Sequence, residues 1–218
     1  MGPSIQKTFL FFSLLVLFTA CSSSITELKN SQITVIFDYQ NEKSNPSAHI
    51  AAFSEASNNV RRCKEIRLIC KENDYQWDAV EPVKFQLNNR NFAGYTNFVM
   101  PAGEKILEGL YDLYYKEVDE HELLYTCKLK YDNRFYKADS SEAQNIINKG
   151  GFAQKLAVYD ENHVLLYLGE YKPEFKNADS LLNKYKTADT RRVIWFANDN
   201  SIACMMVPEK LSNGNNKE

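Results

Sequence analysis

The chain has 218 residues, with 26 lysines and arginines against 28 acidic residues and a formal net charge of −2. No block of like charge occurs, so the composition argues against a nucleic-acid partner and against a surface for anionic lipids. Hydrophobic residues make up 44% of the sequence, which suits a real core in one large domain or two small lobes.

The N-terminus has the anatomy of a signal peptide. Lys7 and the α-amino group precede an apolar run from Phe9 to Phe18 that only Ser13 interrupts. The run is about half as long as the roughly 20 residues that a membrane-spanning helix needs. We therefore expect residues 1–20 to direct export and then to be removed, which moves the net charge to −3 because Lys7 is lost.

The apolar run ends in Phe18-Thr19-Ala20-Cys21. This segment resembles the lipobox of bacterial lipoproteins, in which a small residue precedes an obligatory cysteine. Phe18 in place of the usual leucine is similar to the looser lipoboxes of spirochaetes. The resemblance implies cleavage before Cys21, a diacylglyceryl thioether with an N-acyl chain such as palmitate, and stable membrane attachment. Ser22 after the cysteine implies sorting to the outer membrane under enteric rules.

An ordinary secreted protein is the alternative to a lipoprotein. Cleavage after Ser22 would place Ala20 and Ser22 at the two positions where signal peptidase prefers small residues. In the lipoprotein interpretation, the polar segment 21–31 is a flexible tether and a folded region follows it. Residues 212–218 are expected to form a disordered tail.

The first strands are predicted from alternating apolar residues. Such alternation is typical of strands with one buried and one wet face. It occurs in Ile33, Val35 and Phe37, in Val83, Phe85 and Leu87, and in Leu123, Tyr125, Cys127, Leu129 and Tyr131. Cys127 is therefore expected to face the core.

The mature chain holds four further cysteines, Cys63, Cys70, Cys127 and Cys204. Export permits disulfides, and burial as free thiols is an equally weighted alternative. Cys63 and Cys70 flank a strand-like segment, and their odd separation predicts opposite faces about 23 Å apart, so we expect no bond between them. No Cys-x-x-Cys pair is present and the histidines are scattered, which argues against a zinc site.

A turn and a strand start lie in the middle of the chain. Pro101 and Gly103 predict the turn, and Gly109-x-Tyr111-x-Leu113 predicts the strand. This pattern resembles the tyrosine corner of immunoglobulin-like and prealbumin-like sandwiches, which implies a fold but no function. The charged run 117–122 follows. It is either a boundary between a β-sandwich-like lobe, 32–117, and an α+β lobe, 118–211, or a hairpin loop within one domain.

The C-terminal half adds two short helices and two hairpins. Asp139 with Glu142 predicts a capping box, and Gly150-Gly151 predicts the end of that helix. The apolar faces are Ala143, Ile146 and Ile147 in the first helix and Ala178, Leu181, Leu182 and Tyr185 in the second. Turns at 160–163 and 198–200 join the hairpins. The predicted class is mainly β to α+β, with antiparallel β-sandwich-like sheets and two short helices in the C-terminal half.

Two functional hypotheses follow. The first is a non-catalytic binding or structural module, membrane-anchored in the cell envelope, that takes a protein, glycan or small ligand through aromatic residues. Its candidate surface residues are Tyr75, Trp77, Tyr114 and Tyr115, although aromatic residues also dominate cores. The second is a lipid-anchored extracytoplasmic hydrolase that uses loop carboxylates such as Asp74, Asp78 or Glu81.

No catalytic motif favours the hydrolase. The chain has neither a Gly-x-Ser-x-Gly elbow nor a phosphate-binding glycine loop. Asp119-Glu120-His121-Glu122 lacks the His-Glu-x-x-His spacing, so we interpret it as a charged loop rather than a metal site. His49, His121 and His163 fall in expected loops or strand ends. We therefore favour the binding module and assign no catalytic residue, cofactor or metal ligand.

Overall fold

The structure, a computed structural model, describes residues 26–57 and 60–211. The predicted signal peptide, Cys21, the first part of the tether and the tail after residue 211 lie outside these residues. Strands hold 53% of the described residues and helices 14%, so the prediction of a mainly β, sandwich-like fold with two short helices is confirmed. Within residues 26–57 and 60–211, no helix combines the length and hydrophobicity needed to cross a membrane.

The strands form a nine-stranded sheet and a four-stranded sheet. The larger sheet contains β1 (Leu28–Asp38), β2 (Ser47–Ala56), β5 (Val83–Leu87), β6 (Arg90–Val99), β9 (Phe152–Asp160), β10 (Leu165–Glu170), β11 (Ala188–Ala197), β12 (Ile202–Met205) and β13 (Glu209–Lys210). The smaller sheet contains β3 (Cys63–Cys70), β4 (Tyr75–Val80), β7 (Gly109–Glu117) and β8 (Glu122–Leu129). Neighbours follow the orders β10-β9-β11-β12-β1-β2-β6-β5, with β13 beside β11, and β4-β3-β7-β8. Only the β1–β12 pair, among the pairs of described strands, is parallel.

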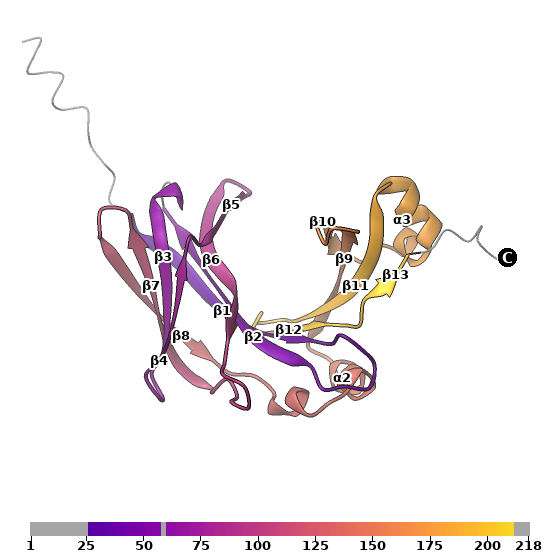
Figure 1. The fold of residues 1–218 in the computed structure, drawn as a ribbon, viewed down its shortest axis with the longest axis horizontal. Helices are drawn as coiled ribbons and strands as arrows, with labels where there is room; N and C mark the ends of the chain where they lie inside the picture. Colours follow the sequence, from indigo (N-terminus) through magenta and orange to yellow (C-terminus); the bar gives the residue numbers. More distant parts are fainter. Residues whose placement is uncertain (1–25, 58–59, 212–218) are drawn as a thin grey trace, which may run out of the picture.

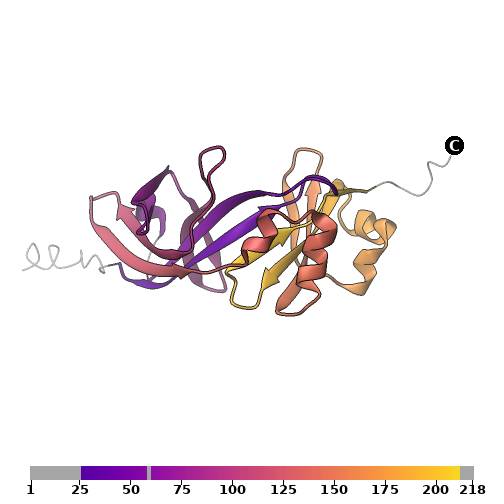
Figure 2. The same cartoon turned by 90° about the horizontal axis from the view of Figure 1, so that it is seen from below.

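The larger sheet curls into a half-barrel, and its two ends rise on the same side of a floor made by β1, β2 and β12 (Figure 1). We call the end with β5 and β6 the N-terminal end and the end with β9, β10 and β11 the C-terminal end. The inner face looks toward the open side, and the outer face looks away from it. Figure 2 shows helix α2 (Ser140–Ile147) lying across the outer face of the floor.

At the N-terminal end, the smaller sheet packs against the outer face and completes a β-sandwich. Ile33, Val35 and Phe37 point into this sandwich and are at most 5% exposed, which confirms the predicted alternation. Leu68 of β3 and Leu113 of β7 are buried opposite them. The core therefore lies between the two sheets, and the larger sheet turns its other face to the open side.

Two helical segments cover the rest of the outer face. Asp139 and Glu142 form the predicted capping box of α2, in which each carboxylate accepts a hydrogen bond from the other residue's backbone N–H. Ala143 and Ile147 are buried beneath the floor. Helix α3 (Ala178–Lys184) covers the C-terminal end, where its Leu181 is fully buried. The predicted apolar faces of both helices are confirmed.

Both predicted hairpins near the C-terminus are present. In the β9–β10 turn, Asp160 Oδ1 accepts hydrogen bonds from the N–H groups of Asn162 and Val164. His163 adopts a positive φ of 60° there, and Asn200 has a φ of 57° in the β11–β12 turn. The turn thus places His163 in the left-handed backbone region.

The tyrosine-corner pattern is also present. The Tyr111 hydroxyl donates a hydrogen bond of 2.7 Å to the carbonyl oxygen of Leu107, at the start of β7. The charged run after β7 is the turn of a hairpin, because β7 and β8 pair directly. The larger sheet includes strands from both segments, 32–117 and 118–211, and so joins them through continuous pairing.

The predicted orientation of Cys63 and Cys70 on opposite faces is wrong. The register between β3 and β7 shifts between Cys63 and Glu65, which marks a β-bulge. The bulge shifts the alternation by one residue and brings Cys63 to the face that holds Leu68 and Cys70. Sequence alternation alone gives no sign of this shift.

Candidate ligand-binding face

The inner face carries three phenylalanines at its N-terminal end, which we call the aromatic cluster. Phe53 of β2, Phe85 of β5 and Phe92 of β6 lie on neighbouring strands and point away from the sandwich core. The ring centroids of Phe85 lie 5.5 Å from Phe53 and 5.2 Å from Phe92. Val83 and Leu87 flank Phe85 on β5 and are 47% and 57% exposed. The alternation predicted for this strand is real, but its apolar side faces the open side and not the core.

Gly94 makes room for the aromatic cluster. A Cβ at this position would stand 2.4 Å from Phe53 Cδ1 and 2.1 Å from the carbonyl oxygen of Ala52. Both distances are shorter than non-bonded atoms tolerate. Glycine in β6 therefore lets the Phe53 ring lie across the neighbouring strand.

An ion pair borders the aromatic cluster. Arg90 Nη2 lies 2.5 Å from Glu55 Oε2, and the guanidinium carbon lies 5.2 Å from the centre of the Phe92 ring. The hydrogen bond from Arg90 lowers the pKa of Glu55, whose side chain is the less exposed of the two. The carboxylate is thus held ionised and paired beside an apolar surface.

The floor of the inner face is closely packed. Ala157, Ile194 and Ala203 come from β9, β11 and β12 and are at most 5% exposed. Ile36 and Met205 pack against them from β1 and β12. These contacts join the first strand of the fold to strands from the C-terminal half, so the floor is a structural junction with little free surface.

A buried ion pair fastens this junction. Arg192 of β11 pairs through Nη2 with Asp38 Oδ1 at the end of β1, and Arg192 is only 8% exposed. The guanidinium also donates to the carbonyl oxygens of Tyr39 and Met206, at 3.0 and 2.8 Å. The charge is therefore enclosed and well partnered, as buried arginines require.

Burial shifts the pKa values of two side chains near this pair. Burial lowers the pKa of His49, and the neighbouring Asp38 opposes that change. Burial raises the pKa of Tyr159, while Arg192 acts in the opposite direction. Both side chains are therefore neutral near pH 7 and serve as packing groups.

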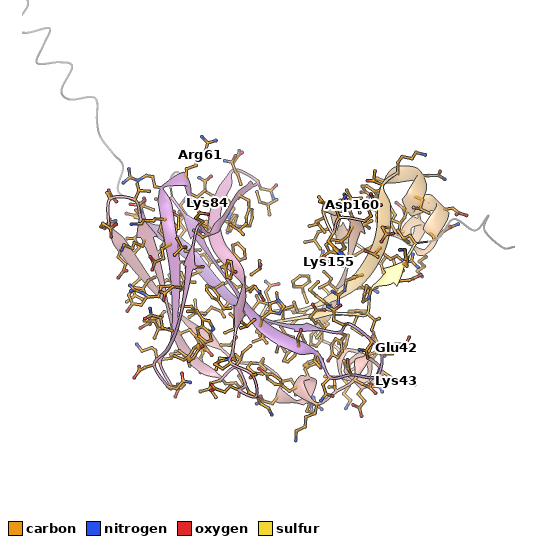
Figure 3. All side chains as sticks on the ribbon, viewed as in Figure 1. Glu42, Lys43, Arg61, Lys84, Lys155 and Asp160 are labelled. Carbon is orange, nitrogen blue, oxygen red and sulfur yellow. The ribbon has the colours of Figure 1, made fainter. Side chains whose placement is uncertain are left out.

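At the C-terminal end, β10 presents a second apolar surface. Leu165 and Leu168 are 47% and 52% exposed and pair with inner-face residues of β9. Lys155 of β9 and Glu170 of β10 lie opposite each other on the same face. Figure 3 shows Lys155 on the side of this end that looks across to the N-terminal end.

The two faces of the larger sheet are covered very differently. The smaller sheet, α2 and α3 cover the outer face, whereas no helix or strand of the described residues crosses the inner face (Figures 1 and 3). Half of the twelve exposed large hydrophobic side chains in the described ranges lie on the inner face. These six are Val83, Phe85, Leu87, Val99, Leu165 and Leu168. The inner face is accordingly the candidate ligand-binding face.

The aromatic residues predicted to form a ligand surface do not gather into one. That prediction is wrong for Trp77 and Tyr115, which are 8% and 0% exposed and belong to the sandwich core. Tyr75 is half-buried against Trp77, with ring centroids 4.6 Å apart. Tyr114 lies on the smaller sheet beneath the guanidinium of Arg67, 4.7 Å from the ring centre. The large volume of these side chains favoured burial over exposure.

The carboxylates considered for catalysis are separated or paired with cations. Asp74 and Glu81 occupy positive-φ turn positions, and Asp78 is exposed on β4 beside Gln76. The acids of the β7–β8 turn form ion pairs, namely Asp119 with Arg62, Glu120 with Lys64 and Lys116, and Glu122 with Arg67. Hydrogen bonds from Lys116 and Lys64 lower the pKa of Glu120 to about 2. In the described parts of the chain, no three His, Cys, Asp or Glu side chains converge as metal ligands.

Cys63, Cys70, Cys127 and Cys204 are all free and buried. Cys127 faces the core as predicted, and the alternative of buried free thiols holds for the other three as well. Burial raises the pKa of Cys63 to about 12 and that of Cys127 to about 11. Such thiols are protonated at neutral pH and unsuited to nucleophilic attack.

A polar hollow of about 620 Å³ lies between β1, β8 and the β11–β12 turn. Gln32, Thr126, Lys128 and Asp199 contribute to its wall. Gln32 Nε2 already donates to the Asp199 carbonyl oxygen at 3.5 Å. Asp199 is the one carboxylate among the described lining residues, and its Oδ1 accepts hydrogen bonds from the N–H and the hydroxyl of Ser201. The hollow is therefore a weaker candidate site than the inner face.

Comparisons with protein-family models, with curated proteins and with solved structures give no match. We therefore infer the function from the molecule's own surface. Sequence reasoning missed the aromatic cluster because Phe53 and Phe92 stand in strands without clear alternation. The alternation of Val83, Phe85 and Leu87 was the available signal, and it was equally typical of a buried strand.

Proposed function

We propose that the chain is a membrane-anchored envelope lipoprotein that binds an apolar ligand, without catalysis, on the inner face of its curled sheet. The observation that carries this proposal is the exposed apolar surface at both ends of that face, while the smaller sheet, α2 and α3 cover the opposite face. Large exposed apolar surfaces on soluble domains mark binding sites. The lipobox-like segment that ends in Cys21 supports the anchor.

The pairing of polar groups favours an apolar ligand over a peptide or glycan. Glu55 is paired with Arg90 and Asp38 with Arg192, so these inner-face charges already have partners. Aliphatic side chains surround the aromatic cluster, whereas a glycan site needs hydrogen-bonding groups placed around its aromatic platform. The surface thus offers burial of carbon atoms as its main source of affinity.

Binding can be measured on chain 22–218, which lacks the signal peptide and the lipid-bearing cysteine. We expect saturable fluorescence of the neutral apolar dye N-phenyl-1-naphthylamine. Phe85→Ser should weaken dye affinity by about tenfold, because a large buried apolar side chain contributes roughly 1.5–3 kcal/mol. Leu124→Ser is the matched control, because Leu124 is similarly exposed, at 53%, on β8 of the smaller sheet.

Equal weakening by Leu124→Ser, or no saturable binding at all, would contradict the proposed site. The non-catalytic part is tested by assaying ester, glycan, phosphate and peptide substrates with the same preparation. Turnover that disappears in His121→Ala or Glu122→Ala would overturn it and support the hydrolase.

A further inference from the structure

We propose that the apolar ligand is a single phospholipid, drawn from the membrane to which the chain is anchored, with its acyl chains held on the inner face. This inference rests on the function proposed above and names its ligand. It follows from where the folded chain begins, from the polarity of the tips of the half-barrel and from the chemistry of the inner face.

The folded chain begins at the tip of the N-terminal end. Thr26 Oγ1 donates a hydrogen bond of 2.5 Å to Glu117 Oε1, and both side chains are buried. Arg62 Nε holds the same carboxylate oxygen at 3.3 Å. The N–H of Ser57 donates to the carbonyl oxygen of Glu27 at 2.8 Å. These contacts fix the first described residues beside the β7–β8 turn.

The tether to the predicted lipid is short. Five peptide steps separate Cys21 from Thr26, and they span at most about 18 Å when fully extended. Leu28 pairs with Ala56, and Ala56 pairs with Asn91 next to the β5–β6 turn. The anchor therefore holds the tip of the N-terminal end close to the membrane, and the open side of the half-barrel lies toward that same tip (Figure 1).

The tips themselves are polar. Asn88 and Asn89 form the β5–β6 turn with positive φ angles of 50° and 60°, and both are exposed. Glu161 and Asn162 are exposed in the β9–β10 turn. Val118 in the β7–β8 turn and Val164 in the β9–β10 turn are 58% and 55% exposed, but Val118 stands beside Asp119 and Val164 follows the exposed Glu161 and Asn162. Burying these polar groups in hydrocarbon would cost more than the two valines gain, so the tips stay at the water side of the interface.

Polar tips and recessed apolar residues together favour an extracted lipid over an inserted protein. Phe85 on one end and Leu168 on the other are set back from the turns and face the inside of the curve. A flat bilayer cannot reach a concave face whose rim is polar. A lipid molecule that leaves the bilayer can place its chains there, because the face replaces the hydrocarbon that the chains leave and keeps their methylenes out of water.

Lipid transfer tests the inference directly. Chain 22–218 is incubated with phosphatidylcholine vesicles that contain a trace of pyrene-labelled phosphatidylcholine, and protein and vesicles are then separated by size. We expect labelled lipid to migrate with the soluble protein. Phe85→Glu and Leu168→Glu should each reduce the transferred lipid by about tenfold or more, because a carboxylate would face the acyl chains. Leu124→Glu should leave transfer unchanged, and circular dichroism confirms that each variant is folded.

The outcomes separate the two proposals. Dye binding without lipid transfer would overturn the phospholipid assignment and leave apolar binding intact. Loss of both dye binding and transfer would overturn the proposed function itself. Protein that floats with the vesicles and forms no soluble lipid complex would show attachment to the bilayer surface, which also overturns the extraction of a single lipid.

Orientation is tested on the full lipid-anchored chain. The four cysteines of the folded region are buried, so a fluorophore can be placed at Asn88→Cys or at Lys43→Cys. Lys43 lies on the far side of the floor from the open side (Figure 3). Energy-acceptor lipids in the bilayer should quench the fluorophore at position 88 more strongly than at position 43. Equal or reversed quenching would contradict an open side that faces the membrane.

Discussion

The two ends of the nine-stranded sheet share an uncovered inner face, but their outer faces are supported differently. At the N-terminal end, a second sheet and a large continuous core stand behind the aromatic cluster. At the C-terminal end, Leu156, Val158, Phe175, Leu181, Ala188 and Leu211 form a much smaller buried cluster beneath α3. We therefore expect the N-terminal end to be a rigid platform and the C-terminal end, which depends on fewer buried contacts, to open at lower free energy.

The largest expected effects come from replacing one buried phenylalanine with alanine at each end of the sheet. The two substitutions should differ in how much of the molecule they destabilise. Phe37 is fully buried and contacts the rings of Tyr131, Phe135 and Tyr136, so Phe37→Ala should reduce the free energy of unfolding by about 3–5 kcal/mol. Phe175→Ala should mainly increase local opening of α3. Urea unfolding measures the loss of global stability in Phe37→Ala, and amide hydrogen exchange measures the opening of α3 in Phe175→Ala. If both variants lost amide protection uniformly over the whole chain, the expected difference in stability between the two ends would be contradicted.

The ion pair between Arg192 and Asp38 connects strands of the two ends at the floor. Disrupting it is expected to cause the next largest loss of stability. Arg192→Met should destabilise the fold by about 3 kcal/mol, because it leaves Asp38 enclosed without its partner. Adding Asp38→Asn should recover part of that loss, since the uncompensated charge disappears. Chemical denaturation of the two variants checks this, and a double variant less stable than Arg192→Met would contradict the account.

The N-terminal caps of α2 and α3 allow a matched comparison of the two ends, with smaller expected losses of stability. Asp139 caps α2 through a reciprocal capping box, whereas Asn177 caps α3 by accepting one hydrogen bond at Oδ1 from the Asp179 N–H. Alanine at either position should cost about 1 kcal/mol locally. Asp139→Ala should lower global stability because α2 packs on the main core, and Asn177→Ala should mostly increase exchange within α3. The reverse pattern would show that the C-terminal end carries the global stability.

The smallest expected effect concerns pH and the floor of the inner face. Burial lowers the pKa of His49, so between its folded value and its unfolded value of about 6.5 only the unfolded state takes up the proton. Stability should therefore fall as the pH drops below about 6.5. His49→Leu should flatten this dependence of the melting temperature. The measurement stays above about pH 5, since carboxyl groups with lowered pKa values, such as Glu120, lose their stabilising charge below their unfolded value.

A large part of the fold was predictable from local pattern. Alternation at Ile33, Val35 and Phe37, the capping box at Asp139 and the turn at Asp160 each depend on residues close in sequence, and the structure confirms all three. The face of β3 on which Cys63 lies was not predictable, because the bulge depends on how β3 pairs with β7. Pairing partners are distant in sequence and leave no local mark.

The candidate site was less predictable than the fold. Val83, Phe85 and Leu87 have the alternation of a buried strand, and only the curl of the sheet leaves them uncovered. Trp77 and Tyr115 were expected on a surface, yet they fill the space between the two sheets. The type of residue sets how much free energy its burial contributes, but the arrangement of the layers decides which face of the sheet a second sheet or a helix covers.

The most direct test of the central claim is a map of where an apolar ligand touches the chain. A fatty acid that carries a photoreactive diazirine is bound to chain 22–218, irradiated, and located by mass spectrometry of peptides. The account predicts adducts concentrated in residues 83–99 and 153–170, at both ends of the inner face, and their loss in Phe85→Glu. Adducts concentrated on β4 and β8 of the smaller sheet, or unchanged by that substitution, would contradict it.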